Sequence, residues 1–180
     1  GEYTNDAHAT IAVHAHPAID DDDAHQLNWL RKAARCTSLL DRSPVVYADR
    51  DWLSSLSYAY STAPGDRGEL LARRVSWACL HLADGTLLLP GLYALFDLRA
   101  ATSVARRTGR LRTGHPWNQP EALDRLREFY LDPVSALRPV SPELADALAL
   151  PARIAVSGHD DPPAVLRHLA SLASPAPEIR

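Results

Sequence analysis

An acid and an arginine stand side by side at positions 49 and 50, directly after the short apolar run of residues 45–48. This run is rich in β-branched and aromatic residues, so the sequence predicts that Asp49 and Arg50 follow the carboxyl end of a buried parallel strand. Ligands and chemistry gather at that edge in open α/β sheets. A guanidinium can grip a phosphate with two hydrogen bonds, and a carboxylate can orient a hydroxyl or a magnesium-bound water. The pair therefore indicates phosphate chemistry.

The elements that must position this pair alternate along the chain. Apolar periodicity predicts helices over about residues 24–40, 52–60, 67–83 and 100–108, from residue 119, and from 158 through 172. Apolar, β-rich runs predict strands over 45–48, 92–97 and 153–157. Strands that alternate with helices indicate a parallel sheet covered on both faces. The predicted fold class is α/β, a three-layer parallel β-sheet flanked by helices.

Composition limits the kinds of partner. The 180 residues are 46% hydrophobic, which favours one globular domain over 1–180. Lys and Arg number 19 against 22 Asp and Glu, and a net charge of -3 argues against nucleic acid as a partner. No apolar run is long enough to span a membrane and no signal peptide opens the chain, so no membrane partner is predicted. Cys36 and Cys79 lack metal-ligand spacing, and two isolated thiols are more often buried apolar residues than a disulfide, so a reducing cytoplasm is the expected compartment.

The stretch from Asp49 to Tyr58 reads Asp-Arg-Asp-Trp-Leu-Ser-Ser-Leu-Ser-Tyr. It resembles the signature of the thymidylate kinase family, which runs Asp-Arg-aromatic, two residues, Ser-Ser, two residues, Tyr. The resemblance covers about residues 27–169 and implies a five-stranded parallel sheet of the P-loop kinase type. It also implies an ATP- and Mg²⁺-dependent phosphotransferase that acts on a nucleoside monophosphate or a nucleoside, usually as a homodimer.

The resemblance assigns roles to named residues. Arg50 would pair with the phosphate of the acceptor, and Asp49 would orient the acceptor oxygen or a magnesium-bound water. The acceptor's sugar and base would be contacted by Ser54, Ser55, Tyr58, Trp29, Arg31 and Arg35. A lid segment at about residues 106–118 would close over the transferred phosphate through Arg106, Arg107, Arg110 and Arg112. Ser157 and Gly158 would contact the ATP.

The sequence departs from the family at several positions. No Gly-x-x-x-x-Gly-Lys-Ser/Thr loop is present, and the only lysine, Lys32, stands in a helical stretch with no glycine before it. Either that loop precedes Gly1 or the activity has been lost. Two alternatives therefore stay open: a non-catalytic nucleotide-binding protein of the same fold, and a kinase for another small-molecule alcohol. Asp51 replaces the aromatic residue of the signature, which leaves the acceptor's identity open.

A metal site at the amino-terminal end is a further alternative. His8, His14, His16 and His25 lie near the acidic run of residues 20–23. Two histidines spaced as 14 and 16 would share one face of a strand. No third ligand stands at a fixed spacing, and an acidic run is usually a solvated loop, so no metal site is predicted.

Overall fold

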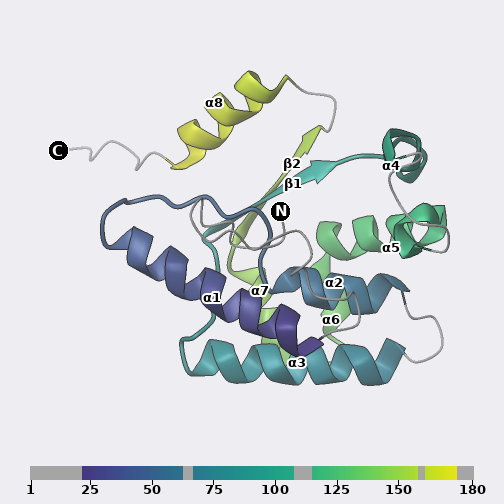
Figure 1. Ribbon diagram of the computed structural model, residues 1–180, viewed down its shortest axis with the longest axis horizontal. Helices are drawn as coiled ribbons and strands as arrows, with labels where there is room; N and C mark the ends of the chain where they lie inside the picture. Colours follow the sequence, from purple (N-terminus) through teal and green to yellow (C-terminus); the bar gives the residue numbers. More distant parts are fainter. Residues whose placement is uncertain (1–21, 63–66, 108–114, 158–160, 174–180) are drawn as a thin grey trace. The chain divides into compact units, whose positions relative to one another are not determined.

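The computed structural model describes residues 22–62, 67–107, 115–157 and 161–173 (Figure 1). The chain divides into two compact units, residues 1–89 and 90–180. Among the described residues, the first unit contains helices without a strand, and the second contains helices and a small parallel sheet. The two units therefore differ in secondary structure, and each is described by itself.

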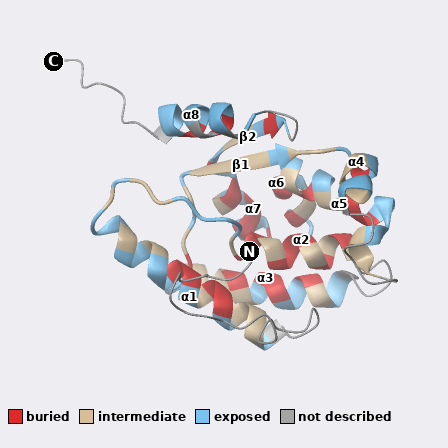
Figure 2. Ribbon diagram, turned by 45° about the horizontal axis from the view of Figure 1, so that its top comes forward, coloured by how far each residue is buried: buried red, intermediate tan, exposed pale blue. Residues whose placement is uncertain are grey.

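Helices α1 (Asp22–Leu40), α2 (Leu53–Thr62) and α3 (Arg67–Ala83) form the first unit. Helices α2 and α3 lie side by side and bury apolar residues along their facing sides (Figures 1 and 2). The buried apolar residues of these two helices are Leu53, Leu56, Ala59, Leu71, Val75 and Ala78. Apolar residues at three- and four-residue intervals make the helices amphipathic, and burial of these faces stabilises the pair.

Ser55, Ser57 and Ser61 of α2 are also buried, and the hydroxyl groups of Ser57 and Ser61 bond within the helix. The Ser61 hydroxyl donates to the Ser57 carbonyl oxygen at 2.6 Å, and the Ser57 hydroxyl donates to the Ser54 carbonyl oxygen at 3.0 Å. These bonds give the hydroxyl donors of Ser57 and Ser61 an acceptor within the helix. Small residues at these positions let a neighbouring helix approach α2 closely.

The second unit holds two strands, β1 (Leu92–Asp97) and β2 (Ala152–Ser157). They pair in parallel, with Leu92 opposite Ala152 and Asp97 opposite Ser157. The connection between them contains α4 (Ala100–Arg107), a 3₁₀ turn η2 (Pro116–Asn118), α5 (Pro120–Leu131), α6 (Pro133–Leu137) and α7 (Pro142–Ala149), and α8 (Pro162–Ala173) follows β2. Because parallel strands need a long crossover, the helices between them are a direct consequence of the pairing.

Proline opens four of these helices, α5 to α8. Its fixed φ suits the first helical position, where the missing N–H costs nothing. Two of the preceding residues also cap their helix: Asp132 accepts from the Ser135 N–H at 3.0 Å, and Ser141 accepts from the Leu144 N–H at 3.2 Å. The short helices α6 and α7 therefore have local signals for where they begin.

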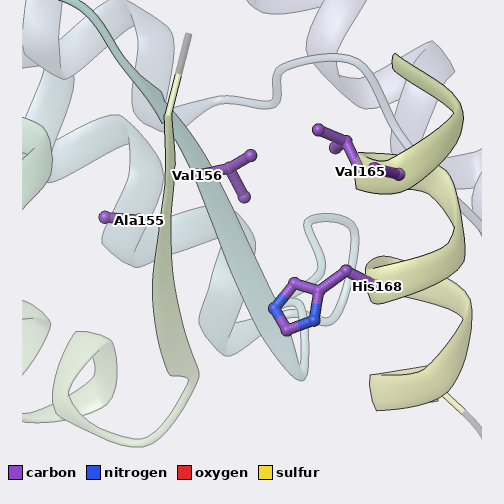
Figure 3. Close-up of a pocket in the computed structure, with 5 residues that line it drawn as sticks. Ala155, Val156, Val165 and His168 are labelled. Atoms are coloured by element: carbon purple, nitrogen blue, oxygen red, sulfur yellow. The ribbon is translucent and has the colours of Figure 1, made fainter. Parts of the chain in front are cut away.

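Helix α8 packs on one face of the sheet. Val156 of β2 lies in a cluster with Val165 and Leu169 of α8, and Ala94 and Ile154 pack against it. Figure 3 shows Val156 pointing toward α8 and Ala155 pointing to the other side of the strand, as alternation along a strand requires. A cavity of about 290 Å³ lies here, and His168 is its only ionisable lining residue among the described residues.

The predicted three-layer sheet is wrong. Over the described residues the sheet has two strands and the chain is mostly helical, so the structure is not the five-stranded P-loop kinase fold. The strands at 92–97 and 153–157 and the helix at 67–83 are confirmed, and the helix expected at 24–40 begins at Asp22. The strand expected at 45–48 is absent, and Tyr47 there is 66% exposed. A β-rich run forms a strand only against a neighbouring strand, and the described part of this unit has none.

Candidate functional site: the turn at residues 49–51

Asp49 and Arg50 lie in a turn between α1 and α2, so the expectation that they follow a strand is wrong. Both side chains are exposed. The backbone of Arg50 is left-handed, with φ 62°, and Arg50 is the only described non-glycine residue with a positive φ. For an L-residue with a Cβ this conformation costs about 1 kcal/mol or more, so contacts nearby must offset it.

Lys32 of α1 supplies such contacts. Its side chain is buried, at 8% exposure, and its Nζ donates to the Asp49 carbonyl oxygen and, at 3.1 Å, to the Arg50 carbonyl oxygen. The same Nζ lies 5.3 Å from the centre of the Trp29 ring, within the range of a cation–π interaction. One ammonium group thus ties two consecutive carbonyls of the turn to α1.

Burial changes the protonation equilibrium of this lysine. Desolvation lowers the pKa of Lys32 below its ordinary value, and the nearby carboxylates of Asp49 and Asp51 partly oppose that effect. Cys36, one helical turn further along α1, has a pKa raised by burial and partly lowered again by Lys32. The Lys32 ammonium has lost much of its water, so its bonds to the turn replace solvation.

On its other side the turn leads directly into α2. The Asp51 carboxylate accepts from the Leu53 N–H at 3.0 Å, and the Asp51 carbonyl accepts from the Ser54 N–H at 3.0 Å. Trp52 is buried, and its indole N–H donates to the Leu88 carbonyl at 3.0 Å. Asp51, which departs from the family signature, therefore satisfies N–H groups at the start of a helix.

Three of the predicted acceptor residues make contacts between the helices of the first unit. The Trp29 indole N–H donates to the Ser55 hydroxyl at 2.8 Å, which joins α1 to α2. Arg74 of α3 donates to the Ser55 carbonyl at 2.6 Å, and its guanidinium lies 5.3 Å from the centre of the Tyr58 ring. Trp29, Ser55 and Arg74 are buried. In this structure the contacts of Trp29 and Ser55 join helices.

The other predicted site residues lie elsewhere. Arg31 and Arg35 are exposed on α1, and Ser54 is partly buried at the start of α2. In the second unit, Arg106 is exposed on α4, the helix ends at Arg107, and Ser157 is exposed at the end of β2. Arg110, Arg112 and Gly158 lie outside the described residues.

An ion pair occupies the end of β1. Arg127 of α5 donates from Nε and Nη2 to the two carboxylate oxygens of Asp97, at 2.5 and 2.8 Å. These bonds lower the pKa of Asp97 and raise that of Arg127. A cavity of about 530 Å³ adjoins the pair and is also lined by Arg99 and Asp124. The Asp97 carboxylate already pairs with Arg127, which offsets part of the positive charge beside the cavity.

Sequence reasoning missed Lys32, Arg74 and Arg127. A signal existed for Lys32, because it stands three residues after Trp29 and one before Ala33, on the buried stripe of α1. A sole lysine on an apolar stripe predicts a buried ammonium with a specific partner. Arg127 pairs with an acid 30 positions away, for which no local pattern exists.

Over the described residues, no group of three or more His, Cys, Asp or Glu side chains could hold a metal ion. His8, His14 and His16 lie outside those residues. No described helix is long and apolar enough to cross a membrane. No family model, curated protein or solved structure matches the chain.

Proposed function

We propose that the protein is an ATP- and Mg²⁺-dependent phosphotransferase that acts on a nucleoside monophosphate or a nucleoside, and that the turn at residues 49–51 binds the acceptor. One observation carries the proposal: an exposed acid and an exposed arginine stand on a turn whose main chain is held by a buried ammonium. The resemblance from Asp49 to Tyr58 supplies the reaction class. The support comes from this motif and its anchoring, since the described residues do not form the expected sheet.

The two exposed side chains suit the two needs of an acceptor site. Arg50 would hold the acceptor's phosphate through paired N–H groups, and Asp49 would orient the acceptor oxygen or a water on Mg²⁺. Phosphoryl transfer depends chiefly on positioning and charge stabilisation, so a turn fixed before the ligand arrives is favourable. The chain contains no glycine-rich loop with a following lysine, so no such loop is assigned to the donor's phosphates.

The remaining charged residues have subsidiary roles in the proposal. Arg106, Arg107, Arg110 and Arg112 would offset the charge of the transferred phosphate, and Ser157 with Gly158 would contact ATP. Removal of these guanidinium groups should lower the turnover number more than acceptor binding, because charge stabilisation acts in the transition state.

The decisive experiment is a coupled ADP-release assay on the full-length protein. The acceptor panel contains nucleosides and nucleoside monophosphates, with sugars and other small alcohols beside them. Turnover confined to one nucleoside or nucleotide is the expected result. Turnover with a sugar alone would change the acceptor class, and nucleotide binding by calorimetry without any turnover would identify a non-catalytic binder instead.

We also propose a cytoplasmic location. Cys36 and Cys79 are both free thiols, as is usual for proteins of a reducing compartment. Cell fractionation followed by immunodetection checks this, and recovery in an extracellular fraction would contradict it.

A further inference from the structure

We propose that Lys32 is a positioning residue for the acceptor: its ammonium fixes the main chain at residues 49 and 50, so that the side chains of Asp49 and Arg50 are presented in one arrangement. The inference rests on the proposed function and goes beyond it, because neither the motif nor the resemblance gives Lys32 a role. Lys32 itself is buried on α1 and acts through the turn.

The first support is the backbone of Arg50. Glycine and asparagine adopt positive φ at lower cost than arginine, yet an arginine stands at this position with φ 62°. Residues kept in an unfavourable conformation persist only where surrounding contacts impose it, and such residues cluster at functional sites. The strain at Arg50 therefore needs both a restraint and a reason.

Lys32 provides the restraint. Its Nζ bonds to the carbonyls on either side of the Arg50 nitrogen and Cα, that is, to those of Asp49 and Arg50. Two consecutive carbonyls directed at one donor define the orientation of the peptide planes that flank Arg50. Rotation of that residue out of the left-handed region would break at least one of these bonds and leave a buried ammonium with poorer solvation.

The cost of burying Lys32 indicates that its bonds to the turn have a purpose beyond joining the helices. Lysine is rarely buried because its ammonium loses water, and desolvation indeed lowers the pKa of Lys32. The helices themselves are joined by other groups, through the Trp29–Ser55 and Arg74–Ser55 bonds. The bonds of Lys32 to the turn reach only the two residues that have proposed acceptor roles.

A matched set of variants separates positioning from simple stabilisation. Lys32→Met keeps the apolar stem and removes the donors, whereas Lys32→Arg keeps a cationic donor. Val75→Ala serves as the control, because Val75 is buried in α3 of the same unit and its loss destabilises the unit through packing. All are studied as the full-length protein.

Two readouts are needed. Hydrogen exchange of the Leu53 and Ser54 amides reports the turn, because both bond to Asp51. Steady-state kinetics with thymidine 5′-monophosphate and with thymidine, in separate series, report the acceptor. Lys32→Met should accelerate local exchange beyond Val75→Ala and raise the acceptor KM about tenfold, with a smaller change in kcat. Lys32→Arg should recover most of the KM.

Each outcome decides the matter. If the wild type turns over an acceptor and Lys32→Met has the same KM as Val75→Ala, the positioning role is overturned while the proposed function stands. If Lys32→Met leaves the exchange of Leu53 and Ser54 unchanged, the restraint itself is overturned. If the wild type neither binds nor phosphorylates any acceptor of the panel, the proposed function and the role of Lys32 both fall.

Discussion

Two regions of the molecule combine an acid with an arginine and use them in different ways. At the turn of the first unit, Asp49 and Arg50 are neighbours in sequence and exposed, while Lys32 bonds to their main chain. At the end of β1 in the second unit, Asp97 and Arg127 come from positions 30 apart and bond to each other through their side chains. In one region the main chain of the acid and the arginine is anchored by a third residue, and in the other their side chains form a closed ion pair.

The difference concerns which charges can meet a ligand. A bidentate ion pair satisfies both carboxylate oxygens and part of the guanidinium, so a ligand must compete with an existing partner. At the turn, the Lys32 ammonium bonds to the carbonyl oxygens of Asp49 and Arg50, and the side chains of these two residues are exposed. This contrast favours the turn as the ligand site and gives the strand end a structural role.

Removal of the Arg50 side chain should have the largest effect on function. Arg50→Ala is expected to lower kcat/KM for the acceptor by about 100-fold or more, because a charge-assisted phosphate contact is lost. The free energy of unfolding should change by less than about 0.5 kcal/mol, since the side chain is exposed and alanine pays the same positive-φ cost. Kinetics and urea unfolding measure the two quantities.

Arg42→Ala is the control, because Arg42 is an exposed arginine of the same connection. Equal loss of kcat/KM in both variants would mean that general positive charge matters and that the turn has no special place. A large loss of stability in Arg50→Ala would show that the side chain holds the structure after all.

Core truncations should show which unit depends more on its packing. Leu56 of α2 is fully buried, at 0% exposure, so Leu56→Ala should cost about 2–5 kcal/mol. Leu95 of β1 is only partly buried, so Leu95→Ala should cost about 1 kcal/mol, because less apolar area leaves water. Urea unfolding compares the free energies, and a larger cost at Leu95 would show that the strands are better covered than their exposure indicates.

Much of this fold followed from local patterns, and the errors have physical causes. Helix α3 and strand β1 were predicted because their periodicity continues over enough residues to identify one structure. Helices α6 and α7 were not predicted, although Asp132-Pro133 and Ser141-Pro142 are recognisable starts. Each helix is too short for periodicity to reveal, so only the capping residue and the proline mark it.

For the site, the motif singled out Trp29, Ser55 and Tyr58; the structure joins Trp29 to Ser55 and places the Arg74 guanidinium over the Tyr58 ring. No spacing rule gives the bond from Lys32 to a turn 17 positions away. The error over residues 45–48 contributed to the wrong fold class, because strand formation depends on a partner strand that a local pattern does not contain. The five-stranded sheet itself was implied by the resemblance, since the residue patterns predicted three strands. Local sequence patterns do not predict which single side chains will meet over long distances along the chain.

A glycine at position 50 should sharpen the contrast by relieving the turn of strain. Arg50→Gly should be more stable than Arg50→Ala by about 1 kcal/mol, because glycine adopts φ 62° without the steric cost that alanine has. Part of this gain is offset because glycine has more conformational freedom in the unfolded chain. Both variants lack the arginine side chain, so the difference between their unfolding free energies reports the backbone alone. Thermal and urea unfolding measure it, and an alanine variant at least as stable as glycine would show that the left-handed conformation carries no strain.

The smallest effect is expected at the strand end, and it depends on pH. The hydrogen bonds from Arg127 lower the pKa of Asp97 in the folded protein. The pair therefore contributes stability above the pKa of an unfolded aspartate, about 4, and this contribution is lost as the pH falls through the lower folded value. Asp97→Asn should cost about 0.5 kcal/mol at neutral pH, a small value because both side chains are partly exposed.

The same substitution should also flatten the dependence of unfolding free energy on pH below about 4, since the variant has no carboxylate to protonate. Asp146→Asn serves as the control, because Asp146 forms a more exposed surface pair with Arg138. Urea unfolding at pH 7 and at several values below 4 measures both effects. If Asp97→Asn instead abolished turnover without this acid-dependent change, the strand end rather than the turn would be the region that meets the ligand, and the contrast between the two regions would be reversed.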